Sequence, residues 1–105
     1  MKIYRHGDLL LVEVKEIPTG LEQKKDDVLL EGEASNHFHR IKGAIITPVS
    51  EAPTILNDYL MGYLEIDKEG ILTHEEHETI IVPRGKYKYL SQREYDPQEE
   101  RRVID

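Results

Sequence analysis

Apolar residues in this chain come mostly in short runs, and these runs are separated by polar residues, Gly and Pro. Leu and Val are concentrated at residues 8–15 and 28–33, and β-branched residues at 44–49 and 78–82. Short runs of this kind, bounded by Gly and Pro, are typical of β-strands. The pattern predicts a chain built from strands.

Turn signals separate the expected strands. The sequence Asp-Lys-Glu-Gly at 67–70 and Pro-Arg-Gly at 83–85 predict turns, and a long strand is expected over residues 86–95. Pro48 would restrict the strand at 44–49 to an edge or an end of the sheet, because proline has no amide hydrogen to donate.

Two segments need a separate interpretation. Residues 54–66 fit either a helical turn or two strands divided near residue 57, and their tyrosines favour a hairpin of two strands. The charged tail at 97–105 follows Asp96, a suitable N-cap, so a short C-terminal helix is expected there. Residues 1–105 are then predicted to form one all-β domain, a small antiparallel barrel or sandwich.

Four of the five histidines stand in two pairs, His37-x-His39 and His74-x-x-His77. Alternate side chains of a strand point to the same face, so His37 and His39 would share a face while Phe38 points to the other side as core. A His-x-x-His pair converges on one point within a turn. If folding brings the pairs together, they predict a metal site with His37, His39, His74 and His77 as ligands.

The expected cofactor is a divalent transition metal, because imidazole binds such ions as the neutral base near pH 7. Zinc is the first expectation, and iron, manganese or nickel would suit the same ligands. The alternatives are two surface histidines flanking a buried Phe38, and a polar turn in which histidine happens to occur twice. His6 is isolated in the sequence and is expected to be incidental.

Carboxylates and arginines near the two pairs are candidate catalytic groups. A zinc ion makes a bound water acidic, a glutamate could then act as general base, and an arginine could hold a small anionic substrate. The candidates are Glu33, Glu75 and Glu76 as bases and Arg40 or Arg93 as the anion-binding residue. Four histidines closed around the ion would instead make a structural site.

Composition narrows the classes of function. A net charge of −7 argues against a general nucleic-acid binder, although Tyr87 and Tyr89 alternate with lysines and offer a single-strand stacking alternative. The absence of cysteine excludes disulfides and thiolate zinc sites. No apolar run approaches the roughly 20 residues of a membrane span, and the first residues lack a signal-peptide core. A soluble, cytoplasmic protein is therefore expected.

The order of Gly32, His37-x-His39 and Pro83-Arg84-Gly85 resembles the two motifs of the cupins, small β-barrels that hold a metal. The resemblance implies a metal in a barrel, with oxygen or isomerase chemistry if the ion is iron, manganese or nickel. The match is partial: residues 43–44 stand where the cupin motif has a glutamate, and Lys88 stands near the place of its later histidine. The second histidine pair would replace those ligands.

Over most of its length the chain more closely resembles small uncharacterised proteins of bacteria and their phages. The resemblance implies that the histidines form one unit, and it carries no activity. The shared segments are Gly7-Asp8, Gly32-Glu33, His37-x-His39-Arg40, His74-x-x-His77 and Arg93-Glu94-Tyr95.

Two functions follow from these patterns. The first is a metal-binding β-barrel acting as a metal-dependent hydrolase or an oxygenase-like enzyme. The second is a non-enzymatic interaction module, such as a phage or host accessory protein, with a structural metal or none. The second is favoured by the small size of this chain, by its charged tail and by the lack of a nucleophile motif. A homodimer is expected, because small barrels often cover an exposed strand edge in this way.

Overall fold

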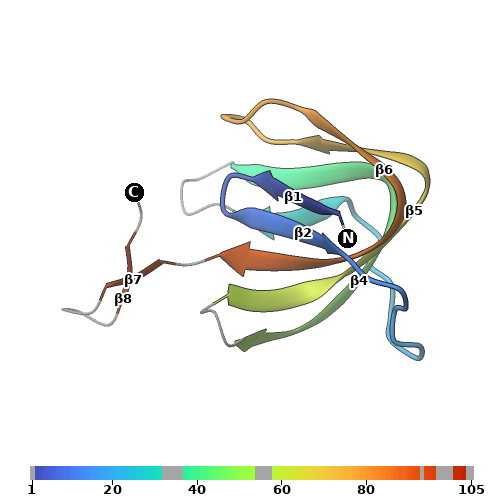
Figure 1. Ribbon diagram of the computed structural model, residues 1–105, viewed down its shortest axis with the longest axis horizontal. Helices are drawn as coiled ribbons and strands as arrows, with labels where there is room; N and C mark the ends of the chain where they lie inside the picture. The colour runs from blue at the N-terminus through green and yellow to red at the C-terminus, as the bar shows by residue number, and fades with distance from the viewer. Residues whose placement is uncertain (1, 32–36, 54–57, 93, 97–100, 104–105) are drawn as a thin grey trace.

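Six antiparallel strands form one sheet in the order β1-β2-β6-β5-β4-β3, seen in the computed structural model of Figure 1. Its strands are β1 Ile3–His6, β2 Leu9–Glu13, β3 Val28–Glu31, β4 Phe38–Pro53, β5 Asp58–Thr73 and β6 Ile80–Gln92. A separate two-stranded sheet pairs β7 Glu94–Asp96 with β8 Arg101–Val103. The structure describes residues 2–31, 37–53, 58–92, 94–96 and 101–103.

The predicted all-β architecture is confirmed, and the closed barrel is not. Strands β1 and β3 stand at the two ends of the strand order and do not pair with each other, so the sheet stays open. The predicted C-terminal helix is wrong for Arg101–Val103, which pair with β7. A helix of so few residues is marginal, whereas strand pairing satisfies the backbone groups directly. The rest of that tail, 97–100 and 104–105, lies outside the described residues.

No helix long and apolar enough to cross a membrane is present in the part of the chain that the structure describes.

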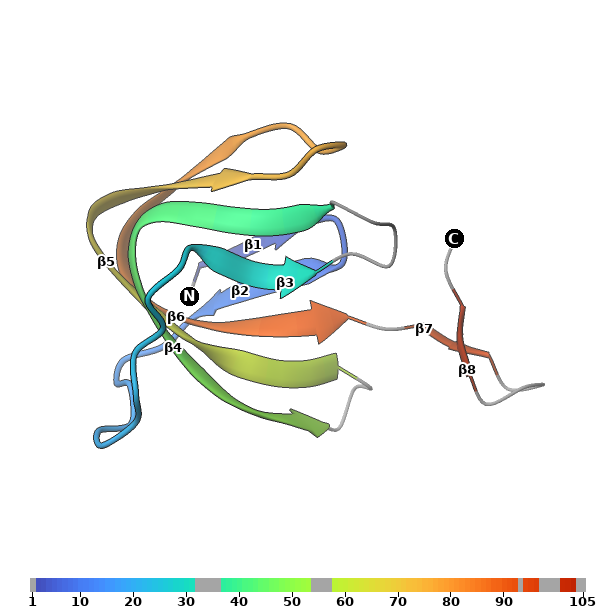
Figure 2. The same cartoon turned by 180° about the vertical axis from the view of Figure 1, so that it is seen from behind.

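The three long strands β4, β5 and β6 curve together and fold the sheet over its own inner face (Figure 1 and Figure 2). The register between β4 and β5 shifts once between Lys42 and Ala44, at Gly43, which has a φ of 87°. A Cβ atom on Gly43 would collide with the carbonyl oxygen of Glu69. Glycine is therefore needed here both for the backbone conformation and for the close approach of the two strands.

The turns expected at 67–70 and 83–85 are wrong, because both segments lie within continuous strands, β5 and β6. They face each other across the same bend: Glu69 pairs with Pro83. A register shift between Ile66 and Glu69 bends the pair of strands without reversing them. Tyr87 braces the bend in β6 by donating a 2.8 Å hydrogen bond to the Pro83 carbonyl.

One local expectation agrees with the structure, and a second is met only in part. Pro48 pairs with β5 on one side, and β3 covers only the first residues of β4, so the strand is close to an edge there. The second half of the expected hairpin at 54–66 is the start of β5 at Asp58, whereas residues 54–57 lie outside the described part.

The core lies on the inner face of the folded sheet. Alternate residues of neighbouring strands meet there, for example Leu11 opposite Tyr89 and Leu64 opposite Tyr87, all almost fully buried. The fully enclosed side chains include Tyr87, Tyr89, Leu9, Leu11, Ile41, Ile46, Leu64, Ile66, Leu72 and Val82. The packing on the inner face is therefore mainly aliphatic, with two buried tyrosines.

The prediction that Phe38 belongs to the core is wrong. His39 and Ile41 are the buried residues at the start of β4, and Phe38 is half-buried on the other face. The reason is the fold of the sheet, which encloses the face carrying His39. A histidine thus takes a core position at the end of the apolar layer.

We expect Gly43→Ala to lower the free energy of unfolding by about 3 kcal/mol or more. The positive φ costs roughly 1–2 kcal/mol for an L-residue, and the clash with Glu69 adds to it. Gly20→Ala is the matched control, since Gly20 has a φ of 84° and no atom within 4 Å of an added Cβ. Equal losses for the two variants in denaturant unfolding would contradict a tight bend.

Stability should also fall at alkaline pH because of Tyr89. Burial raises its pKa to about 12 from an ordinary 10.0. The neutral phenol is favoured by folding, so its contribution is complete below pH about 10 and is lost as the pH rises toward 12. At about 1.4 kcal/mol per unit, the loss approaches 2–3 kcal/mol. Unfolding of Tyr89→Phe across this range should show a shallower decline, and an unchanged slope would argue against this cause.

Candidate metal centre

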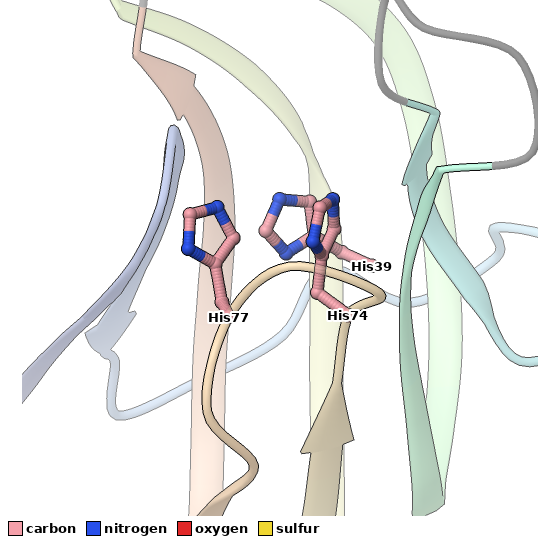
Figure 3. A group of neighbouring side chains, drawn as sticks. All are labelled: His39, His74 and His77. Carbon is pink, nitrogen blue, oxygen red and sulfur yellow. The ribbon is translucent and has the colours of Figure 1, made fainter.

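Three of the four predicted ligands come together at one end of the core (Figure 3). His39 comes from the start of β4, and His74 and His77 come from the loop between β5 and β6. One ligand nitrogen of each lies within 4.8 Å of the other two. The ring centroids are 4.4 Å apart for His39 and His74 and 4.5 Å apart for His74 and His77. Imidazoles at this spacing could hold a transition-metal ion.

Strand pairing explains why these residues meet. Arg40 of β4 lies opposite Thr73, the last residue of β5, so His39 on β4 and His74, the first residue after β5, stand side by side. The loop then turns back to β6 at Ile80 and carries His77 over the same end of the sheet. His39 is 1 % exposed, His74 is half-buried and His77 is exposed. The cluster therefore runs from the core to solvent and is accessible from one side.

His37, the fourth predicted ligand, stands outside this group of three. Its Nδ1 lies 3.4 Å from a Glu76 carboxylate oxygen, and its ring centroid is 5.7 Å from that of His74. The expected shared face with His39 depended on strand alternation, but β4 begins only at Phe38. A role for His37 as a ligand stays a prediction that the geometry does not favour.

Glu75 and Glu76, two of the predicted bases, contact the segment that leads into β4. A Glu75 carboxylate oxygen accepts a 2.7 Å hydrogen bond from the Phe38 amide, and this bond lowers the pKa of Glu75. Glu76 lies beside His37. Both glutamates thus hold the histidine loop against β4, and their role as bases stays a prediction. Glu33 and Arg93 lie outside the described residues.

Arg40, the predicted anion-binding residue, is engaged elsewhere. Its guanidinium lies 3.2 Å from an Asp27 carboxylate oxygen and 4.8 Å from the centre of the Phe38 ring. Alternation along β4 places it on the face opposite His39. The structure therefore does not bring Arg40 to the three histidines, and its catalytic role stays a prediction.

His6, expected to be incidental, is instead buried beside the cluster at 4 % exposure. Its Nδ1 lies 2.9 Å from Nδ1 of His39, and its Nε2 donates a 2.7 Å hydrogen bond to the Glu78 carbonyl. Burial lowers the pKa of His6, and the neighbouring His39 and His77 lower it further. Strand β1 was not expected from the sequence, and the Gly7-Asp8 turn between β1 and β2 was the signal that could have revealed it.

The β1–β2 turn packs directly on the cluster. Gly7 has a φ of 63°, and a Cβ atom there would lie 2.5 Å from Nε2 of His77. Asp8 follows with a carboxylate oxygen 3.1 Å from Nε2 of His39, and this hydrogen bond lowers the pKa of Asp8. The turn therefore touches both the buried and the exposed members of the histidine group.

His74 already uses one of its ring nitrogens. The Glu76 amide donates a 3.0 Å hydrogen bond to Nδ1 of His74, so this nitrogen carries no hydrogen. Burial lowers the pKa of His74, with the nearby His39 as the next cause. A metal ion on Nδ1 would take its lone pair, and an ion on Nε2 would require a hydrogen on Nδ1. Either mode of binding by the neutral ring therefore breaks the bond from Glu76.

Other features of the sequence map away from the cluster. Tyr87 and Tyr89, considered for stacking on single-stranded nucleic acid, are buried in the core and cannot stack on bases. A surface pocket of about 400 Å³ is lined by Lys24, Asp26, Val28, Leu29, Leu30 and Met61, none of them a histidine. The histidine group thus lies outside that pocket.

A family model described as a domain of unknown function, DUF8820, matches residues 5–92. The chain belongs to the DUF8820 family. The match spans β1 to β6 and so includes every histidine described above. No curated protein matches the chain. No solved structure matches it either. An uncharacterised family was expected from the sequence and is confirmed, whereas the phage connection and the cupin resemblance stay expectations.

A zinc titration followed by amide NMR tests His74 as a ligand. The Glu76 amide proton should move upfield and exchange faster as the ion binds, because its acceptor on His74 is lost. The broken bond costs about 1 kcal/mol, which a metal site readily outweighs. The Val28 amide, bonded to Asp26 in a distant loop, is the internal reference. Stoichiometric zinc binding with an unshifted Glu76 amide would remove His74 from the ligand set.

Proposed function

We propose that this DUF8820 protein binds one divalent transition-metal ion through His39, His74 and His77, with zinc as the first choice, and uses the ion in hydrolysis. The observation that carries the proposal is the meeting of three imidazoles, drawn from two separate parts of the chain, with ligand nitrogens within 4.8 Å. The chain contains no cysteine, so nitrogen and oxygen donors are the ones that a site here can offer.

The chemistry of the three donors fits zinc. Imidazole nitrogens bind zinc at about 2.0–2.1 Å, and catalytic zinc sites commonly have three protein ligands. His39 is buried and in contact with His6 and Asp8, whereas His77 is exposed to solvent. One fixed and two more accessible donors could close on an ion that arrives from solvent.

The exposure of the cluster favours an open site over a structural one. A structural zinc is enclosed by four protein ligands, but here His77 faces solvent and His37 stands apart from the other three. A zinc ion with an open position lowers the pKa of a bound water to about 7 and so supplies a nucleophile at neutral pH. A hydrolytic function follows from this chemistry more directly than a structural function.

The protein would contribute binding and positioning to such a reaction. His39 anchors the ion to the core, and the loop with His74 and His77 forms the side from which a substrate would approach. Glu76 lies on that same loop, next to His37, and its exposed carboxylate is a candidate base. A small anionic substrate is retained from the sequence analysis, without a part for Arg40.

Two other functions are alternatives to hydrolysis, and a measurement of which ion the protein binds, if any, distinguishes them from it. Iron, manganese or nickel on the same imidazoles would favour the oxygenase-like chemistry implied by the cupin resemblance. A protein without a bound ion would instead be an interaction module, and its open sheet edges β1 and β3 are the surfaces where a second chain or a copy could add.

Elemental analysis of the purified protein should give about one zinc per chain, lost in His39→Ala and His77→Ala. His37→Ala is the matched control and should keep the ion, because His37 stands outside the three-histidine group. Zinc-loaded protein should hydrolyse a simple activated ester, and His77→Ala should lose this activity. An equal loss of metal in His37→Ala would overturn the ligand set. A protein that binds none of zinc, iron, manganese and nickel would support the interaction module.

A further inference from the structure

A line of hydrogen-bonded nitrogens passes from the backbone through His6 and His39 to Asp8. The Glu78 carbonyl is 2.7 Å from Nε2 of His6, Nδ1 of His6 is 2.9 Å from Nδ1 of His39, and Nε2 of His39 is 3.1 Å from an Asp8 carboxylate oxygen. Both ends of the line are acceptors, because a carbonyl and an ionised carboxylate have no hydrogen to donate.

The line has three contacts but too few hydrogens to fill them. A neutral imidazole carries one N–H group, so His6 and His39 together supply two hydrogens. The first lies between His6 and the Glu78 carbonyl, because only His6 can donate there. The second belongs to His39 and fills only one of the other two contacts. With this hydrogen on Nε2, it bonds to Asp8 and the two Nδ1 lone pairs face each other; with it on Nδ1, it bonds to His6 and the lone pair on Nε2 faces the Asp8 carboxylate.

Two lone pairs that face each other at this distance repel, and a cation between them removes the repulsion. One further proton would satisfy the pair His39 and Asp8, and so would a metal ion bound to both. The second arrangement makes use of the other two imidazoles, whose nitrogens lie within 4.8 Å of a nitrogen of His39. A proton would fill that one contact, whereas an ion bound to His39 would also bind the nearby nitrogens of His74 and His77.

The spacing of the two atoms also suits an ion. Two ligand atoms about 2.0 Å from a tetrahedral zinc are about 3.3 Å apart. The Asp8 oxygen and Nε2 of His39 are separated by 3.1 Å, close to that edge length. The turn that carries Asp8 also packs against Nε2 of His77 through Gly7. Asp8 lies outside the group whose ligand atoms are all within 4.8 Å of one another, so its half-exposed carboxylate would have to turn toward the other two imidazoles as an ion binds.

We propose that Asp8 is a fourth metal ligand, and that His6 is a positioning residue that fixes His39 with a hydrogen on Nδ1 and with Nε2 toward the ion. The inference rests on the proposed metal binding and extends it to the N-terminal hairpin. Histidine ligands commonly donate their second ring N–H to an acceptor held in the surrounding protein, and His6 fills this place for His39. The ion would thus have three nitrogens and one oxygen from this chain, and the water needed for hydrolysis would enter as a fifth ligand.

Zinc affinity, measured by competition with a chelator, tests the role of Asp8. Asp8→Asn keeps the shape of the side chain and should weaken zinc binding by about 100-fold or more, beyond the 10–100-fold typical of residues behind the ligands. Asp27→Asn is the matched control: it removes the same charge from a partly exposed aspartate paired with Arg40. It should leave the affinity within about threefold.

The same assay tests the positioning role of His6. His6→Ala should weaken zinc binding by about 10–100-fold. His6→Asn should recover part of the loss, because its amide oxygen can accept the hydrogen from Nδ1 of His39. An affinity equal to that of the unaltered protein in His6→Ala would overturn the positioning role.

Long-range ¹H–¹⁵N spectra of the imidazoles in the unaltered, zinc-loaded protein give a readout that does not depend on a variant folding. We expect zinc on Nε2 of His39 and a hydrogen on its Nδ1, with the hydrogen of His6 on Nε2. Zinc on Nδ1 of His39 would overturn the inference, as would equal affinities for Asp8→Asn and Asp27→Asn. In either case zinc binding itself, and with it the proposed function, would stand; failure of the unaltered protein to bind zinc would remove both.

Discussion

The close approach of β4 and β5 at Gly43 is the constraint on which the rest of the structure depends. With the Glu69 carbonyl against its Cα and with a positive φ, Gly43 allows two long strands to bend at one level. β6 bends beside them because Pro83 pairs with Glu69. The bend closes the inner face over the aliphatic and aromatic core. It also carries the start of β4, the β5–β6 loop and the β1–β2 turn to the same end of the sheet (Figure 1).

The sequence predicts strands well and their lengths poorly. Alternation and β-branched runs identify β2, β3 and parts of β4 and β6, because those signals report local backbone preference and burial. Gly and Pro at 67–70 and 83–85 were interpreted as turns, yet they mark a shared bend. Whether such residues reverse a strand or bend it depends on the strand beside them, which no local pattern records. The sequence could not predict that the sheet stays open for the same reason, because closure depends on pairing between strands that are distant in the sequence.

The candidate site could be predicted in part for similar reasons. Tight spacing identified the two histidine pairs, and three of those four residues do meet. His37 was included through an alternation that begins one residue too late, at Phe38. His6 and Asp8 were missed as partners because nothing nearby in the sequence links them to His39. Their contact depends on a hairpin at residues 3–13 packing against the distant strand β4.

The hydrogen bond from His6 to the Glu78 carbonyl joins segments that are 72 residues apart. Such long-range contacts require the intervening loops to close first, so we expect them to be weak in the transition state for folding. An ion shared by the turn at residue 8 and the loop at 74–77 would act on the same late step. Its binding energy would lengthen the lifetime of the folded state and leave the rate of folding almost unchanged. The ion would therefore act on kinetic stability: it would bind after the chain has folded and would have to dissociate before the chain unfolds.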